Sequence, residues 1–383
     1  FFSGSINDKT DMEFDDNGNQ TLYIGYYWNT NTQSFVPNLK REYSYDENGN
    51  ITLYIEYNWN SESQSFVPNS KLESSYDENG NRTLFIQYYW NSESQSLVLT
   101  YKQEYSFDEN GNLTLFIQYI WDSESQSLVP TYKQEYSFDE NGNYTFYIRY
   151  NWNSESQSFV PNIKVESSFD ENGNQTLYIK YNWDSESQSF VPEQKQESSF
   201  DENGNLTLFI QYYWNSESQS FVPNIKVESS FDENGNQTLY IKYNWDSESQ
   251  SFVPSRKYEN TFDENGNRTF NITYNWNTES QSFVTISEVE YSYDENGNQT
   301  LSIYYNWDSE SQSFVPNYKF ENNYDENGNR TLYIKYNWDS ESQSFVPNDK
   351  LEYSFDENGN RTLYIEYIWD SVIEVFYEFS KEM

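Results

Sequence analysis

The sequence contains no cysteine and no histidine among its 383 residues. The absence of cysteine excludes disulfide bonds and thiolate metal ligands, and the absence of histidine removes imidazole ligands and the commonest general base. No segment approaches the ~18 consecutive apolar residues that a membrane helix needs. Basic residues are also scarce, because 22 lysines and arginines stand against 62 acids and leave a net charge of −40. This charge disfavours nucleic acid and anionic lipid as partners.

What the sequence does contain is an internal repeat without insertions. Twelve tryptophans, from Trp28 to Trp369, follow one another at intervals of 31 residues, and twelve glycines from Gly18 to Gly359 keep the same interval. Each period therefore carries one fixed turn and one fixed aromatic residue. We expect a continuous array over residues 15–369, preceded by a partial repeat or edge strand (1–14) and followed by a capping or donor strand (370–383).

Each period reads as two β-strands. Residues 52–59 alternate between apolar and polar, which predicts a half-buried strand with leucine, isoleucine, tyrosine and tryptophan on one side. Residues 66–76 alternate in the same way. The predicted structural core consists of Leu53, Ile55, Tyr57, Trp59, Trp90 and Trp121.

The segment Asp46–Asn50, D-E-N-G-N, predicts a type I turn with a G1 bulge, and an Asn-Gly type I′ turn is the alternative. The predicted turn glycines are Gly49, Gly80 and Gly111. Counting outward from Asp46 opposite Asn50 predicts the pairs Tyr43–Leu53, Leu39–Tyr57, Pro37–Trp59 and Lys40–Glu56. The same register places Lys164 opposite Lys180, with Glu166 expected between them.

These elements predict an all-β fold in which 12 hairpin repeats of 31 residues form one long, twisted antiparallel sheet. A parallel β-solenoid is the alternative, but it would stack the acidic turns ~4.8 Å apart and so raise their repulsion. The second connection, Asn60–Ser65, is polar and is expected to be a longer, more mobile loop. The aromatic face must be covered by the sheet winding on itself or by a second copy of the chain.

The acids gather at the hairpin tips, where 40 of the 62 lie in connecting segments. The candidate metal ligands are Asp46, Glu47, Asp77, Glu78, Asp108 and Glu109. Oxygen atoms at alternate positions of D-x-N-G-N are suited to calcium, but the glycine spacing differs from an EF-hand loop and turn formation alone explains the motif. The prediction is therefore no cofactor, with Ca²⁺ as the alternative.

Two features of the sequence make carbohydrate a candidate ligand or modification. The N-x-T pattern makes Asn50, Asn81 and Asn112 candidate glycan attachment sites, although asparagine closing a turn and threonine opening a strand explain it equally. Rows of tyrosine can also stack on sugar rings, and the outward Tyr54 and its equivalents, flanked by Glu42 and Thr52, are the best placed. Surface glycans are thus candidate partners.

The segment Phe355–Tyr367, F-D-E-N-G-N-R-T-L-Y-I-E-Y, resembles the YD repeat of Rhs-type shell proteins and the Y-D-x-N-G-N-x-T repeats of bacterial surface proteins exported by the type IX pathway. The first resemblance implies a spiralling β-sheet able to enclose a cargo. The second implies a secreted or surface-anchored protein. Asparagine stands where the YD pattern has arginine after glycine.

An enzyme needs one singular constellation of residues, whereas here every acid, tyrosine and lysine recurs with the same neighbours, so we expect no catalytic site. The sequence predicts an extracellular or cell-surface structural and adhesive protein, such as a filament subunit, stalk or coat. The alternative is a multivalent carbohydrate- or calcium-binding module. Self-association is expected, through the tail Ser371–Phe379, read as a strand after a much shorter loop, or through Phe1–Phe2.

Overall fold

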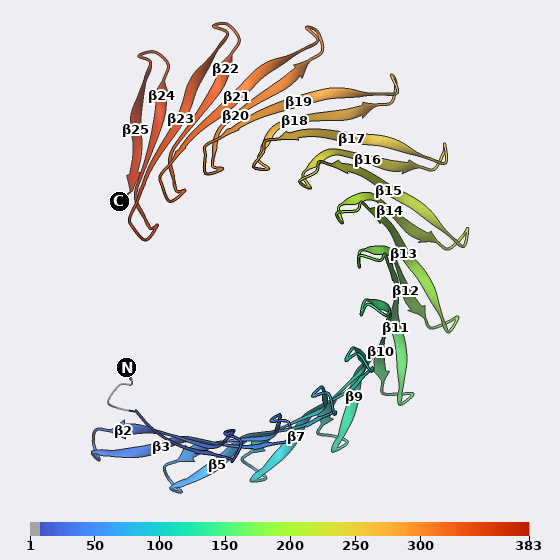
Figure 1. Ribbon diagram of the computed structural model, residues 1–383, viewed down its shortest axis with the longest axis vertical. Coiled ribbons are helices and arrows are strands. Elements are labelled where there is room, and N and C mark those ends of the chain that lie inside the picture. Colours follow the sequence, from blue (N-terminus) through green and yellow to red (C-terminus); the bar gives the residue numbers. More distant parts are fainter. Residues whose placement is uncertain (1–7, 383) are drawn as a thin grey trace. The chain divides into compact units, whose positions relative to one another are not determined.

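The computed structural model describes residues 8–382 as strands and turns (Figure 1). All 25 strands belong to one antiparallel sheet, which confirms the predicted all-β fold and excludes the solenoid. No helix in this range is long and apolar enough to span a bilayer. The strands are β1 (Asp8–Phe14), β2 (Gln20–Asn29), β3 (Ser34–Tyr45), β4 (Ile51–Asn60), β5 (Ser65–Tyr76), β6 (Arg82–Asn91), β7 (Ser96–Phe107), β8 (Leu113–Asp122), β9 (Ser127–Phe138), β10 (Tyr144–Asn153), β11 (Ser158–Phe169), β12 (Gln175–Asp184), β13 (Ser189–Phe200), β14 (Leu206–Asn215), β15 (Ser220–Phe231), β16 (Gln237–Asp246), β17 (Ser251–Phe262), β18 (Arg268–Asn277), β19 (Ser282–Tyr293), β20 (Gln299–Asp308), β21 (Ser313–Tyr324), β22 (Arg330–Asp339), β23 (Ser344–Phe355), β24 (Arg361–Asp370) and β25 (Val375–Glu382).

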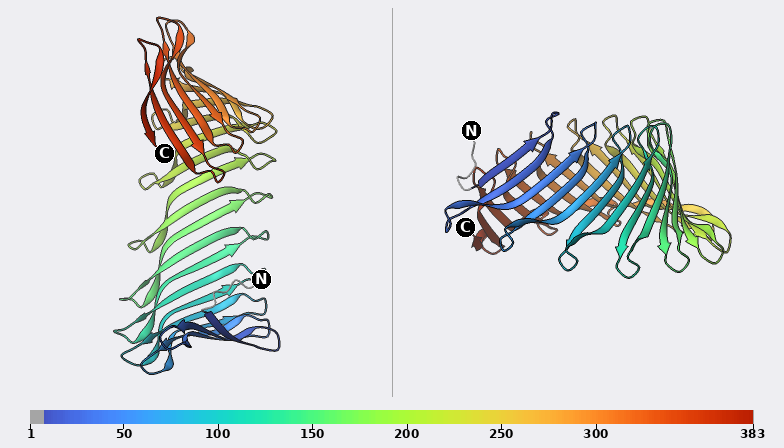
Figure 2. Two further views of the ribbon diagram at one scale, coloured as in Figure 1. Left: turned by 90° about the vertical axis from the view of Figure 1, so that its left-hand side faces the viewer. Right: turned by 90° about the horizontal axis from the view of Figure 1, so that it is seen from below.

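The chain forms two compact units that meet inside β13, the first ending at Glu193 and the second beginning at Gln194. Within each unit consecutive strands pair with one another, as the hairpins of Figure 2 show. Contacts are therefore almost entirely between sequence neighbours. This is the arrangement expected of a linear repeat array.

The D-E-N-G-N turns have the predicted conformation. In the second repeat the Gly49 amide donates to the Asp46 carbonyl at 3.1 Å, and the Asp46 amide donates to the Asn50 carbonyl at 3.0 Å. Gly49 has a φ of 83°, in the left-handed region that glycine adopts without steric penalty. The same bonds recur from Asp15 to Asn360, so the type I turn with a G1 bulge is confirmed over the type I′ alternative.

The second connection is shorter than predicted, because the strands extend into it and leave only residues 61–64 as a turn. Its last residue, Gln64, has a φ of 49°, so a non-glycine residue occupies the left-handed region. The Asn60 side chain accepts from the amides of Glu62 and Ser63 at 2.9 and 3.0 Å. The asparagine or aspartate after tryptophan is therefore a turn cap, which the sequence interpretation missed.

The predicted register is wrong by one residue beyond the turn. Tyr45 lies opposite Ile51, but Ser44 lies opposite Leu53, so Thr52 is an extra residue that forms a β-bulge. The slip changes every later pair, so the residues of β3 that share a face with Leu53, Ile55, Tyr57 and Trp59 differ from those predicted. The observed pairs that replace the predicted ones are Tyr43–Tyr54, Leu39–Asn58, Lys40–Tyr57, Arg41–Glu56, Pro37–Tyr26 and Trp59–Phe66.

The predicted opposition of two lysines is also wrong. Lys164 lies opposite Tyr181 and Lys180 lies opposite Val165, so the two lysines occupy opposite faces of the sheet and Glu166 does not separate them. Each lysine has its own carboxylate: Lys164 contacts Glu166 at 2.8 Å and Lys180 contacts Glu193 at 2.6 Å. The like-charge cost that the predicted register implied is therefore absent.

A second bulge accommodates proline inside the strands. In β5, Ser70 lies opposite Glu56 and Pro68 lies opposite Tyr57, which leaves Asn69 as the extra residue. Proline lacks the amide that a ladder hydrogen bond requires, so inside a sheet it is confined to edges and bulges. The bulge persists where the copies carry Leu99 or Thr285 in place of proline.

Neither face of the sheet is fully covered within residues 8–382. The only buried apolar side chains there are Phe116, Val165, Val289 and Ile365. The residues predicted to form the core, Leu53, Ile55, Tyr57, Trp59, Trp90 and Trp121, are all half-buried. Side chains of neighbouring strands shield these residues in part, and no second layer of structure covers them within residues 8–382.

The tail continues the repeat and does not depart from it. β24 and β25 are joined by residues 371–374, a turn of the same length as the others, and Glu374 takes the left-handed φ of the repeat's glutamine. The prediction of a much shorter loop is therefore wrong. β25 pairs with β24 and β1 pairs with β2. Phe1–Phe2 lies outside the described residues.

Candidate binding face

One face of the sheet carries the same side-chain cluster in almost every repeat. In the second repeat the Lys40 ammonium contacts the Glu42 carboxylate at 2.6 Å and lies 4.6 Å from the centre of the Tyr57 ring. The Tyr57 hydroxyl donates to the other oxygen of Glu42 at 2.6 Å. Lysine, glutamate and tyrosine thus form a closed triad, which the register slip creates by placing Lys40 opposite Tyr57.

The triad shifts the ionisation of its members. Partial burial alone would raise the pKa of Glu42, but hydrogen bonds from Lys40 and Tyr57 outweigh it and hold the pKa of that carboxyl below its usual value. Burial, together with the bond to the Glu42 carboxylate, raises the pKa of Tyr57 to about 12. The triad is therefore a charged lysine–glutamate pair with a neutral phenol at neutral pH.

The triad recurs along both units with two departures. Asp11 replaces the glutamate beside Lys9, and Glu288 replaces the lysine beside Glu290. An edge-to-face contact between Trp59 and Phe66, 5.0 Å between ring centres, extends the cluster and recurs in most repeats. We call the surface formed by Lys40, Glu42, Tyr57, Trp59, Phe66 and their equivalents the constant face.

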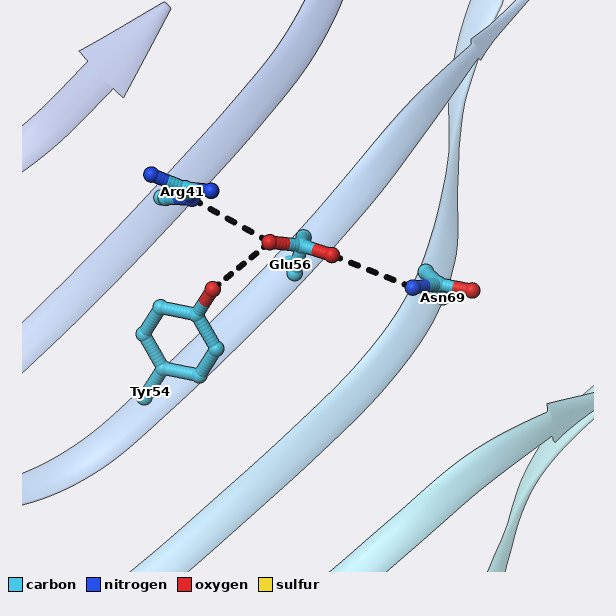
Figure 3. Close-up of polar contacts among 4 residues, drawn as sticks. All are labelled: Arg41, Tyr54, Glu56 and Asn69. Carbon is cyan, nitrogen blue, oxygen red and sulfur yellow. Dashed lines mark hydrogen bonds and ion pairs between the residues drawn. The ribbon is translucent and has the colours of Figure 1, made fainter. Parts of the chain in front are cut away.

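The opposite face differs from repeat to repeat. In the second repeat Glu56 gathers three partners (Figure 3): Arg41 Nε at 3.1 Å, the Tyr54 hydroxyl at 2.7 Å and Asn69 Nδ2 at 3.1 Å. Burial and the bond to Glu56 raise the pKa of Tyr54 to about 12. We call the surface formed by Arg41, Tyr54, Glu56, Ser70 and their equivalents the variable face.

The side chains of the variable face differ in charge and polarity as well as in size. The residues at the position of Glu56 in the other repeats are Gly25, Gln87, Gln118, Arg149, Lys180, Gln211, Lys242, Thr273, Tyr304, Lys335 and Glu366. The constant face, by comparison, has tyrosine at the position of Tyr57 in all twelve repeats. One face thus presents a uniform cluster and the other presents a changing set of charges, amides and rings.

Sequence reasoning placed Tyr54 outward and Glu42 beside it, and the structure corrects the neighbour. Glu42 lies on the constant face opposite Ile55, while the carboxylate that contacts the Tyr54 hydroxyl is Glu56. Two signals in the sequence could have revealed the two faces. Proline within a strand marks the second bulge, and comparison of the repeats position by position separates uniform from changing residues.

The candidate calcium ligands lie at the turn tips, where the aspartates are already engaged. One oxygen of Asp46 accepts from the amides of Asn48 and Asn50, and the other accepts from the Asn50 side chain at 3.0 Å. These bonds, from the Asn50 side chain first, lower the pKa of Asp46. Asp77 and Asp108 make the same bonds, and Glu47, Glu78 and Glu109 follow them at the exposed tips. No three acids in residues 8–382 gather in a metal-binding arrangement.

The candidate glycan acceptors share those turns. The side-chain nitrogen of Asn50, the atom that a glycan would modify, donates to Asp46, and those of Asn81 and Asn112 donate to Asp77 and Asp108. The turn glycines Gly49, Gly80 and Gly111 all have φ between 82° and 83°. Structurally, the whole motif is a hydrogen-bonded turn.

Two hollows of the variable face stand out, one within each unit. In the second unit, β16, β17 and β18 line a volume of about 880 Å³ that includes Tyr240, Lys242, Arg256, Tyr258 and Arg268. In the first unit, β9 to β12 line a smaller hollow of about 300 Å³ that is rich in tyrosine, with Tyr136, Tyr144 and Tyr147 among its walls. The larger hollow has basic and amide walls, and the smaller one has aromatic walls.

No protein-family model and no curated protein matches the sequence. Among solved structures, the chain is similar to a protein of unknown function from Bacteroides fragilis, at 17% identity over 42% of this chain and 91% of that chain, with a TM-score of 0.21. It is similar to a DUF3836 family protein from Parabacteroides distasonis, at 18% identity over 24% of this chain and 82% of that chain, with a TM-score of 0.21. It is also similar to the TcdB2-TccC3 structure, at 10% identity over 94% of this chain and 24% of that chain, with a TM-score of 0.27.

All three TM-scores are low, so the class of this protein is defined by its own strands and turns. The chain spans about a quarter of the TcdB2-TccC3 chain that it matches. The described residues define an antiparallel β-hairpin repeat protein with one constant and one variable face.

Proposed function

We propose that the chain is a non-catalytic structural and adhesive protein that works outside the cell and binds its partner through the variable face. The observation that supports this function is the contrast between the two faces. The constant face uses its lysine, glutamate and tyrosine in closed triads, which leaves those groups bonded to one another. The variable face offers a different set of side chains at each step along the array.

A repeat array with one changing surface suits recognition because its binding surface is extended. The strands hold their side chains at fixed spacing, and weak contacts repeated along a rigid array add together as avidity. Tyrosine supplies large contact area with few rotatable bonds, and it is abundant on this face. The extracellular location rests on the resemblance of the turn motif to repeats of exported surface proteins.

Self-association is a second candidate, and a separate observation favours it. In residues 8–382 both sheet faces leave apolar side chains half-exposed, and β1 and β25 each pair with only one strand. Exposed strand edges and apolar faces are the surfaces through which β-proteins assemble. A filament or coat would combine both candidates.

The experiment that tests the proposal is a binding screen of the purified chain against extracellular polysaccharides and matrix proteins, with light scattering of the chain alone. Binding to a defined partner by a monodisperse chain supports the adhesive function. Concentration-dependent assembly without ligand supports self-association. A monodisperse chain that binds no member of the screen contradicts both.

A further inference from the structure

The larger hollow of the variable face concentrates positive charge in a strongly acidic chain. Lys242 on β16 lies directly opposite Arg256 on β17, and Arg268 on β18 lines the same hollow. No carboxylate in residues 8–382 forms an ion pair with any of the three. Arg256 instead donates to the Tyr258 hydroxyl at 3.1 Å, and Arg268 donates to the Tyr291 hydroxyl at 3.1 Å.

This arrangement is unfavourable for folding, because like charges directly opposite each other in a sheet repel. Two other cations on this face do have a carboxylate partner, since Arg41 contacts Glu56 and Lys180 contacts Glu193. With a net charge of −40, the chain has ample acid to neutralise the hollow. Unpaired like charges retained at one place point to an anionic ligand.

The hollow lies where one aromatic ring of the repeat is missing. The position of Tyr54 holds an aromatic residue in ten repeats, but it holds Asn271 in β18 and Ser302 in β20. The Asn271 side chain turns to donate to Asn260 at 2.9 Å and leaves the space of a ring open. The resulting volume of about 880 Å³ lies within the range of sites for small ligands.

The walls indicate what kind of anion fits. They combine the three cations with amides of Asn260, Asn271 and Asn275, with Tyr240 and Tyr258, and with no aliphatic side chain. Amides donate and accept, as sugar hydroxyls require, and the two tyrosine rings, 5.6 Å apart, provide faces for sugar C–H groups. A peptide partner would ordinarily insert an aliphatic or aromatic anchor into an apolar pocket, which this hollow lacks.

We propose that the hollow of β16–β18 binds an acidic oligosaccharide, with its carboxylate or sulfate groups on Lys242, Arg256 and Arg268. This proposal rests on the proposed adhesive function and adds the ligand class of one stretch of the variable face. The sugar hydroxyls bond to the asparagine amides, and a ring lies against Tyr240 and Tyr258. Binding releases the repulsion between Lys242 and Arg256, so it also stabilises this part of the sheet.

The test is calorimetric titration of the full chain with a tetragalacturonate, a sulfated tetrasaccharide and the methyl-esterified, neutral tetragalacturonate. We expect one or both acidic sugars to bind and the neutral sugar to bind at least tenfold more weakly, with affinity falling as salt rises. Binding of the tetragalacturonate would identify carboxylate as the recognised group, and binding of the sulfated tetrasaccharide would identify sulfate. Equal binding of the neutral sugar, or tighter binding of a poly-glutamate peptide, would overturn the proposal.

Two variants and a control locate the site. Asn271→Tyr restores the ring present in ten other repeats, so it should fold normally and narrow the hollow, and Arg256→Gln removes the central charge. Each should weaken acidic-sugar binding at least tenfold, whereas Lys381→Gln, on the constant face, should not. Equal weakening by all three variants, or none by Asn271→Tyr and Arg256→Gln, would contradict the site. If the chain still binds another partner through the variable face, the adhesive function survives that failure.

Discussion

At the residue scale, the triad is the unit that makes the constant face uniform. The tyrosine hydroxyl, the glutamate and the lysine satisfy one another, so a carboxylate can stay charged on a half-buried surface. The lysine also lies over the tyrosine ring, at 4.1 Å for Lys195 and Tyr212. None of these contacts depends on a second layer of structure.

Removing one tyrosine hydroxyl from a triad should therefore destabilise the sheet locally. Tyr212→Phe deletes the donor to Glu197, 2.6 Å away, and should lower the free energy of unfolding by about 1 kcal/mol. Tyr213→Phe is the matched control, because Tyr213 is the next residue in the strand and is 47% exposed on the other face. Urea denaturation measures both, and equal effects of the two substitutions would contradict a structural role for the triad.

Glu288 is the residue at which the triad fails. It occupies the lysine position beside Glu290, and the Tyr305 hydroxyl lies 3.1 Å from Glu290, a longer bond than in other triads. Burial and the nearby Glu290 raise the pKa of Glu288 above its usual value. Because the folded state then holds the proton more tightly than the unfolded state, Glu288 lowers stability as pH rises through and above that usual value.

Glu288→Lys should rebuild the triad with Glu290 and Tyr305. We expect stabilisation by about 0.5–1 kcal/mol at pH 7, since a like-charge contact becomes an ion pair. The gain should shrink as pH falls through the raised pKa of Glu288, because protonation of Glu288 in the native chain removes the like-charge contact. Thermal melting of both chains across pH 3–8 provides the measurement. A gain that is independent of pH would show that charge is not its cause.

At the element scale, the hairpins show what sequence patterns can and cannot predict. The D-E-N-G-N turn was predictable because glycine in the left-handed region and aspartate at the first position have specific structural causes. The turn at the other end of the hairpin was missed because it contains no glycine. Gln64 and its equivalents take the left-handed conformation there instead. Strand existence and alternation were predictable, but one unrecognised bulge at Thr52 was enough to change which residues of neighbouring strands share a face.

The same reasoning predicts opposite effects of substitution at the two turns. Gln188 has a φ of 51°, which is unfavourable for a side chain with a Cβ atom. Gln188→Gly should therefore stabilise the chain by about 0.5–1 kcal/mol after the entropy cost of glycine is subtracted.

Gly173→Ala is the counterpart at the other turn. Gly173 has a φ of 83°, and a Cβ atom would meet nothing closer than 3.7 Å, so the expected loss of about 1–2 kcal/mol comes from the backbone alone. Guanidinium denaturation of both variants tests the pair. Destabilisation by Gln188→Gly would show that the turn depends on the glutamine side chain and not on its backbone angle.

At the scale of the whole molecule, the number of repeats can change without disrupting the remaining ones, because contacts join mainly neighbouring strands. Residues Val160–Pro192 recur letter for letter at Val222–Pro254, two periods later. Deleting 192–253 therefore joins Val191 to Pro254 without creating a new junction sequence. The deletion also places Lys180 where Lys242 stood, opposite Arg256, which retains the chemistry of the basic hollow.

The shortened chain should fold with an unchanged circular dichroism signal per residue and remain soluble. Nearest-neighbour stabilisation predicts this result, because no long-range contact is lost. Circular dichroism and size-exclusion chromatography provide the measurement. Loss of β-structure would show that the sheet depends on contacts between distant repeats.

The sequence was also informative at this scale about architecture, since period, antiparallel order and the acidic turns follow from local chemistry. It did not reveal which side chains share a face, because that depends on two one-residue bulges per repeat. The variable face and its basic hollow therefore follow only from the folded structure. Their residues, Lys242 and Arg256 among them, carry no motif of their own.

The most direct test of the account is ligand binding by an array with a uniform variable face. In this variant every repeat carries, at the positions of Arg41, Tyr54, Glu56 and Ser70, the residues that the repeat beginning at Val160 has at those positions. The constant face is unchanged. The account predicts a folded chain with near-native melting that has lost its binding to the partner found in the screen. Native-level binding by this array, or its failure to fold, would contradict the division into a constant framework and a variable binding face.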